Sequence, residues 1–158
     1  MRSIDKYYID NIGSITKIQY IAIDEIDSMS RPIHGVGTIT LKNNSEWYNL
    51  YFTPYTADYK MEFKSDHKGS YFAFSVSASI PVYSEHLNTM INFLTNHSFV
   101  VKIYDANGYI RALGSLDFPC KFQYKGTTGQ KPADKNHIVF EFSANSKYAP
   151  IMLYEPGT

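Results

Sequence analysis

Asp105, Ala106, Asn107 and Gly108 contain part of the pattern of a calcium-binding loop. A helix–loop–helix calcium site needs D-x-[DN]-x-[DN]-G, followed by a glutamate that completes the coordination. Here Gly108 comes two positions too early, and the residues on both sides alternate as strands do. An Asn-Gly pair readily adopts the positive φ angles at which two strands reverse direction. The sequence therefore favours a hairpin turn over a calcium site.

The segment KGTTGQKPADK, residues 125–135, resembles a phosphate-binding loop in composition only. Such a loop requires G-x-x-x-x-G-K-[ST] between a strand and a helix. The glycine spacing differs, Pro132 stands where Ser or Thr is needed, and a strand is predicted to follow. Two interpretations stay open for a long hairpin loop over residues 125–137. It is a solvated tip, or it is an arm whose Lys125, Lys131 and Lys135 contact a neighbouring subunit or an acidic surface.

Other reactive side chains do not form a recognisable catalytic or metal-binding pattern. Asp24, Glu25 and Asp27 could act as acid and base only if they converged in a pocket, and a solvated strand end is the simpler interpretation. The five histidines lack H-x-H and H-E-x-x-H spacing, and the lone Cys120 falls on the apolar side of its predicted strand. We expect no enzymatic activity, no metal and no cofactor.

An aromatic segment, EWYNLYFTPYTADY at residues 46–59, offers a different kind of function. It is an aromatic-rich strand and turn, or it is a contact surface, since Tyr and Trp concentrate in the centres of protein interfaces. The second interpretation is favoured. The candidate interface residues are Trp47, Tyr48, Tyr51 and Tyr55.

The composition limits the classes of protein that the chain can represent. Its 158 residues are 44% hydrophobic and 19% charged, with 15 basic and 15 acidic side chains. We expect one globular domain over residues 1–158 with an N-terminal arm at residues 1–14. The charge balance argues against an obligate nucleic-acid binder. With no signal-peptide core and no long apolar run, we expect synthesis and use in the cytosol, without a membrane partner.

Period-two alternation dominates the chain and predicts strands at 15–23, 36–42, 59–64, 70–78, 116–124 and 137–143. Pro119 places the fifth of these at a sheet edge or a bulge. Leu87, Met90, Ile91 and Leu94 instead follow a helical period, so one helix is expected at about residues 84–96, capped by Ser84. The predicted fold is mostly β, an antiparallel sandwich or barrel with one packed helix.

Two stretches resemble small tail and connector proteins of tailed phages that infect gut Bacteroidales, the crAss-like group. The first is GSITKIQYIAIDEIDSM, residues 13–29. The second comprises FVVKIYDANGYIRALGS and GTTGQKPADKNHIVFEFSANSKYAPIMLY in the C-terminal half. His137 departs from the pattern, which has small polar residues there. The positions that match or define the turns are Asp105, Asn107, Gly108, Gly114, Gly129, Asp134, Ser146, Ala149, Pro150 and Tyr154.

The resemblance implies a structural protein of the virion tail or neck, assembled in the bacterial cytoplasm. Such a protein would pair with copies of itself in a sixfold or twelvefold ring. It would dock other tail, neck or portal proteins and let genomic DNA pass without sequence specificity. The competing hypothesis is a glycan-binding β-sandwich, in which sugars stack on exposed aromatic rings such as Trp47.

Overall fold

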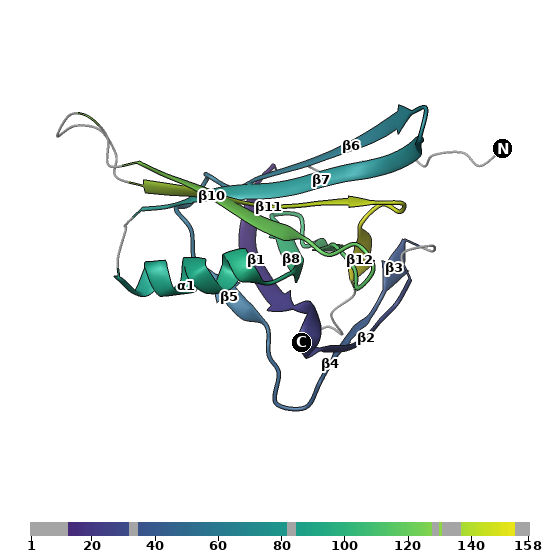
Figure 1. Ribbon diagram of the computed structural model, residues 1–158, viewed down its shortest axis with the longest axis horizontal. Helices are drawn as coiled ribbons and strands as arrows, with labels where there is room; N and C mark the ends of the chain where they lie inside the picture. The colour runs from purple at the N-terminus through teal and green to yellow at the C-terminus, as the bar shows by residue number, and fades with distance from the viewer. Residues whose placement is uncertain (1–12, 32–34, 82–84, 128–129, 131–136, 154–158) are drawn as a thin grey trace.

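The computed structural model describes residues 13–31, 35–81, 85–127, 130 and 137–153. Two β-sheets lie face to face, and one α-helix packs beside them (Figure 1). The predicted β-sandwich with one helix is therefore confirmed. The helix, α1 (Glu85–Asn96), buries Leu87, Ile91 and Leu94, which lie at helical spacing. Its proposed Ser84 cap lies outside the described residues.

The larger sheet has six strands, and every pairing in it is antiparallel except that of β12 with β3. In spatial order the strands are β3 (Val36–Gly37), β12 (Ile151–Leu153), β9 (Ile110–Leu113), β8 (Phe99–Asp105), β1 (Ile15–Ala22) and β5 (Tyr48–Leu50).

The second sheet has four antiparallel strands in the order β10 (Lys121–Thr127), β11 (His137–Ser146), β7 (Gly69–Ile80) and β6 (Asp58–Asp66). A small third sheet pairs β2 (Ile26–Met29) with β4 (Ile39–Leu41), after a short 3-10 helix, η1 (Ile23–Glu25). Figure 1 shows the long β6–β7 hairpin rising away from the rest of the molecule at its far end.

Aromatic rings fill the space between the two main sheets. Phe99 of β8 meets Phe142 of β11 edge to face, with ring centroids 5.8 Å apart, and Tyr20 of β1 meets Phe99 in the same way at 5.6 Å. Such geometry places the positive edge of one ring on the negative face of the other. Phe140 and Phe142 come from alternate positions of β11 and are fully buried. The period-two pattern that predicted this strand thus supplies the core.

Three predicted boundaries are wrong for identifiable reasons. The strand expected at 116–124 begins only at Lys121, because Ser115 closes a turn with Phe118 and Pro119 has no N–H to donate. The strand expected at 36–42 is split at Thr38, since β3 pairs with β12 whereas β4 pairs with β2. Lys125, taken as the start of the long loop, lies inside β10 opposite Val139, and His137, taken as its end, begins β11.

The Asp105 segment forms the turn of the β8–β9 hairpin. Oδ1 of Asp105 accepts hydrogen bonds from the backbone N–H groups of Asn107 and Tyr109, both at 2.9 Å, and Oδ2 accepts one from Arg111 Nη1 at 2.9 Å. Gly108 has φ +84°, which suits glycine. The carboxylate of Asp105 therefore holds the turn together, as the hairpin interpretation expects.

Gly114 lies where the two main sheets are joined. Phe99 of β8 and Cys120, just before β10, exchange backbone hydrogen bonds of 3.0 and 2.8 Å. A Cβ at Gly114 would lie 3.0 Å from the Cys120 nitrogen and 3.2 Å from the Phe99 oxygen, and its φ is +85°. Only glycine fits this backbone crossing without moving one of the sheets. Gly129, the other predicted turn glycine, lies outside the described residues.

We predict that Gly114→Ala lowers the free energy of unfolding by about 3 kcal/mol, because it adds backbone strain and an overlap with main-chain atoms. Gly108→Ala is the matched control, since its φ is +84° but a Cβ there meets nothing within 4 Å. It should cost about 1 kcal/mol. Urea titration of both variants measures the difference. Equal losses would contradict the assignment of Gly114 to the junction between the sheets.

Candidate functional site

The connection from β5 to β6 presents two tyrosines to solvent. Tyr51 is 82% exposed and Tyr55 is 93% exposed, the highest values among the large hydrophobic side chains described. We call residues 51–55 the aromatic loop. Two tyrosine rings in water leave a large apolar area uncovered, while each hydroxyl tip remains solvated. This is the property expected of an unoccupied contact surface.

A strained turn fixes the position of Tyr55. The turn runs from Thr53 to Thr56, and the Thr56 N–H donates to the Thr53 carbonyl at 3.3 Å. Tyr55 has φ +63°, in a place where glycine or asparagine is preferred. Strain of this kind persists only where surrounding contacts enforce it, and it concentrates at functional positions.

The surrounding contacts come from the end of β7. Thr53 N donates to the Ser79 carbonyl at 2.8 Å, and Ser79 N donates to Thr56 Oγ1 at 3.2 Å. The same hydroxyl donates to the Thr53 carbonyl at 2.6 Å. The aromatic loop is thereby tied to the four-stranded sheet at both ends of its turn, so Tyr55 projects from a rigid support.

Trp47 and Tyr48 differ from the two loop tyrosines because they make defined contacts within the chain. Trp47 is half-buried, and Lys102 Nζ lies 4.4 Å from its ring centroid. Tyr48 donates to Glu25 Oε1 at 3.3 Å and lies against Tyr20, with ring centroids 5.7 Å apart. The negative charge of Glu25, more than desolvation, raises the pKa of Tyr48. Trp47 and Tyr48 therefore hold the segment against the rest of the chain, whereas Tyr51 and Tyr55 remain exposed to solvent.

Shallow grooves flank the aromatic segment on both sides. One, of about 530 Å³, lies between the start of β1 and the loop, and its lining includes Lys17, Tyr51 and Tyr55. The other, of about 560 Å³, lies between β5 and α1, and its lining includes Trp47, Tyr48 and Met90. Both are open to solvent, and the structure thus brings the four predicted aromatic residues to one continuous margin of the molecule.

Of the three predicted lysine candidates, the described one, Lys125, does not join this margin. Lys125 is exposed on β10, at the opposite edge of the four-stranded sheet from β6. Lys131 and Lys135 lie outside the described residues. Met61 and Phe63 of β6 are further exposed apolar residues, at 47% and 62%, which the sequence analysis did not single out. Alternation assigned them correctly to the apolar face of β6 but gave no sign that this face is uncovered.

The other reactive residues are dispersed. Asp24 and Glu25 lie in η1 and Asp27 in β2, and Glu25 is directed to Tyr48. Cys120 is fully buried, and burial raises the pKa of its thiol well above the ordinary value. Within the described ranges no group of three or more His, Cys, Asp or Glu side chains has the arrangement of a metal site.

No helix in the described part of the chain has the length and apolar character needed to cross a bilayer. Comparison with protein-family models, curated protein sequences and solved structures finds no match to this chain.

Proposed function

We propose that the chain is a structural subunit of a tailed bacteriophage, which assembles with copies of itself into a ring in the tail or neck. The ring would surround the channel that DNA crosses and dock other virion proteins. The resemblance of residues 13–29 and of the C-terminal half gives the protein class. The display of Tyr51 and Tyr55 on a strained, tied-down turn is the single observation that carries the assembly role.

A ring requires two different surfaces on each copy that fit each other. The aromatic loop supplies a compact apolar projection, and the groove between β5 and α1 offers a concave surface that includes Trp47, Leu87 and Met90. Tyrosines that become fully buried in such a contact are the residues that usually dominate binding energy. The balanced charge of the chain also suits a channel wall that DNA slides past rather than grips.

We predict that Tyr55→Asn abolishes or strongly weakens assembly into the ring without weakening the fold. Asparagine tolerates a positive φ, so the free energy of unfolding should stay constant or rise by up to about 1 kcal/mol. Loss of the Tyr55 aromatic side chain should raise the dissociation constant of the assembly by at least about tenfold, the usual effect of truncating an aromatic residue at an interface. Sedimentation velocity over a concentration series measures the assembly, and urea titration measures the stability.

The matched control is Tyr109→Asn, which removes another exposed tyrosine from the β8–β9 hairpin, outside the aromatic loop. It should leave assembly unchanged. Assembly of the Tyr55→Asn variant equal to that of the wild-type protein would remove the aromatic loop from the subunit contact.

The exposed tyrosines keep the glycan-binding alternative testable. The ring of Trp47, its expected sugar platform, is already approached by Lys102 Nζ at 4.4 Å, so Tyr51 and Tyr55 are better placed to stack on a sugar. We expect no binding on a glycan array. Sugar binding that disappears in the Tyr55→Asn variant would replace the ring proposal by the glycan-binding one.

A further inference from the structure

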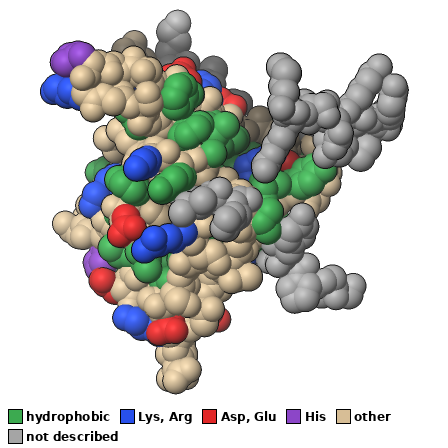
Figure 2. All heavy atoms as spheres, turned by 90° about the vertical axis from the view of Figure 1, so that its right-hand side faces the viewer, with side chains coloured by type: hydrophobic (Ala, Val, Ile, Leu, Met, Phe, Trp, Pro, Cys, Tyr) green, Lys and Arg blue, Asp and Glu red, His purple; other side chains and the backbone are tan. Residues whose placement is uncertain are grey.

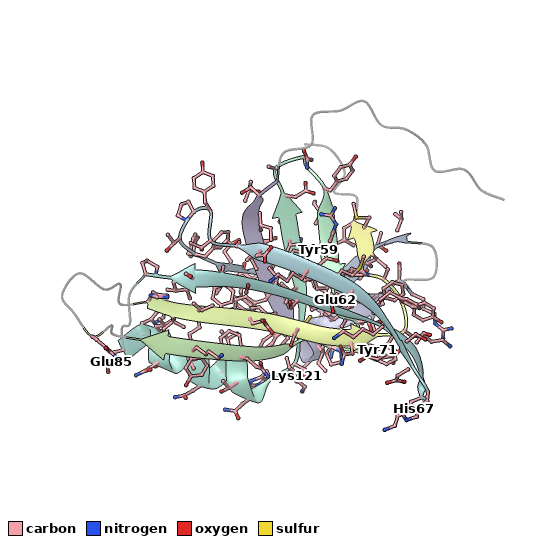
Figure 3. All side chains as sticks on the ribbon, turned by 90° about the horizontal axis from the view of Figure 1, so that it is seen from above. Tyr59, Glu62, His67, Tyr71, Glu85 and Lys121 are labelled. Atoms are coloured by element: carbon pink, nitrogen blue, oxygen red, sulfur yellow. The ribbon has the colours of Figure 1, made fainter. Side chains whose placement is uncertain are left out.

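Strand β6 is a long edge of the four-stranded sheet, and no other strand pairs with that edge in the described part of the chain. It pairs with β7 over its whole length, Asp58 to Asp66, and forms one end of the strand order. Figure 3, seen from above, shows this edge with Tyr59 and Glu62 along it and His67 at the tip of the hairpin. Unpaired backbone N–H and C=O groups at such an edge can bind another strand.

The apolar face of β6 is only partly covered. Phe63 contacts Phe72 across the hairpin, with ring centroids 5.2 Å apart, yet Phe63 is 62% exposed and Met61 is 47% exposed. The reason is that the hairpin rises away from the other elements at its far end (Figure 1). Figure 2 views the side toward which the hairpin points and shows hydrophobic side chains there among charged ones.

The polar face of β6 carries alternating charges whose neighbours on β7 are uncharged. Asp58, Lys60 and Glu62 lie opposite Ser77, Ser75 and Ala73, respectively. The ion pairs that the charges do make, Lys60 with Asp58 at 3.4 Å and Lys64 with Glu62 at 3.5 Å, lie along the strand and are exposed. Exposed pairs of this kind contribute little stability. The charge pattern is therefore available to a strand on the other side.

The sequence DYKMEFK, residues 58–64, is complementary to its own reverse about Met61. If a second β6 runs antiparallel with Met61 opposite Met61, then Lys60 faces Glu62, Asp58 faces Lys64, and Tyr59 faces Phe63. Every charge meets the opposite charge, and every apolar residue meets an apolar one on the other face of the sheet. Opposite charges and aromatic or apolar pairs at directly facing positions both stabilise antiparallel strands.

We propose that β6 is a homodimer contact, in which two copies of this chain pair their β6 strands antiparallel about a twofold axis at Met61. The contact is isologous, so each favourable pair occurs twice except Met61 with Met61, which lies on the axis. It extends the four-stranded sheet into one of eight strands. It also places Tyr59, Met61 and Phe63 of one copy beside Phe63, Met61 and Tyr59 of the other, which reduces the exposure of the overhanging apolar face.

Edge charges often serve to repel other strands, and β10 shows that pattern. Its outward-facing residues are Lys121, Gln123 and Lys125. The two lysines are positively charged and Gln123 is neutral, so this edge repels a second β10. Charges that alternate in sign along β6, and that are opposite at equal distances on either side of Met61, would not repel a second β6 strand. The mixed signs of β6 attract a second copy in the Met61 register.

A second possible occupant of the β6 edge is β10 of a neighbouring copy. In its best register Glu62 faces Lys121, Asp58 faces Lys125, and Met61 faces Phe122. This arrangement leaves Lys60 opposite Gln123, so it satisfies fewer charges than the β6–β6 contact. In this arrangement Met61 faces Phe122 of the neighbour. A disulfide between two Met61→Cys chains would therefore form only in the β6–β6 arrangement.

The contact uses residues different from those of the aromatic loop and does not depend on the ring proposal. If the ring contact and the β6 contact both form, the twofold β6 contact joins two rings. The Tyr55→Asn variant removes ring assembly and leaves the β6 dimer, whereas the β6 variants described below do the reverse, so either proposal can fail alone.

The first test is Met61→Cys in the full chain, oxidised under mild conditions. Directly facing residues in an antiparallel pair have the Cα separation that a disulfide needs. Phe63→Cys is the control, because its two introduced thiols would be offset by about 13 Å along the strands. The native Cys120 is fully buried and does not compete. We expect the Met61→Cys dimer to form at least about tenfold faster than the control. Equal rates overturn the proposal.

The second test reverses charges in separate copies. Lys60→Glu alone places two negative charges opposite each other, and Glu62→Lys alone places two positive charges opposite each other. Each should raise the dimer dissociation constant by about tenfold. A mixture of the two variants restores opposite charges in the heterodimer and should recover wild-type affinity, as should the double variant Lys60→Glu/Glu62→Lys with itself.

Sedimentation velocity with one variant fluorescently labelled measures the mixture. Failure of the mixture to dimerise, while both variants retain the wild-type unfolding transition, overturns the proposal. Dimerisation of the Lys60→Glu variant alone at wild-type affinity also overturns it, since the proposed register makes that contact repulsive.

Discussion

The pair of backbone hydrogen bonds between Phe99 and Cys120 is the constraint on which the rest of the structure depends. These bonds join a strand of the six-stranded sheet to Cys120, the residue directly before β10 of the four-stranded sheet. Gly114 permits the approach because it has no Cβ to separate the chains. Once the sheets are fixed at this point, the rings of Phe99, Phe142 and Tyr20 fill the space between them. The aromatic core and the sheet junction therefore form one unit.

The same arrangement determines which parts of the molecule remain available for contacts. The junction and the aromatic core bury residues of β1 and β8 in the larger sheet and of β7, β10 and β11 in the four-stranded sheet. Strand β6 lies at the opposite edge of its sheet from β10, and the short β5 ends the other sheet. The aromatic loop connects these two edges. The candidate contact features thus lie at, or between, the edges where the two strand orders end.

The sequence predicted the fold where one physical pattern dominated. Phe140 and Phe142 alternate with polar residues, and Leu87, Ile91 and Leu94 follow a helical period, so β11 and α1 were predicted well. Prediction failed at Thr38 and at residues 116–120, because the hydrophobic pattern continues there while the pairing partners change. A local pattern can predict pairing across a tight turn, as between β8 and β9, but not pairing between strands that are distant in the sequence.

Some features of the candidate site could likewise be predicted from the sequence and others could not. Aromatic composition singled out Tyr51 and Tyr55 as candidate contact residues, but their difference from Trp47 depends on Lys102, which is distant in sequence. The exposure of Met61 and Phe63 could not be predicted, since it depends on how far the hairpin extends past the other elements. The self-complementary order of DYKMEFK was present in the sequence, but its meaning depends on β6 being a free edge.

We propose that this protein works by assembling with copies of itself. Native mass spectrometry of the wild-type protein over a concentration series from nanomolar to tens of micromolar tests this proposal. We expect one closed oligomer of fixed stoichiometry that replaces the monomer as concentration rises. A protein that remains monomeric across the whole series would contradict it.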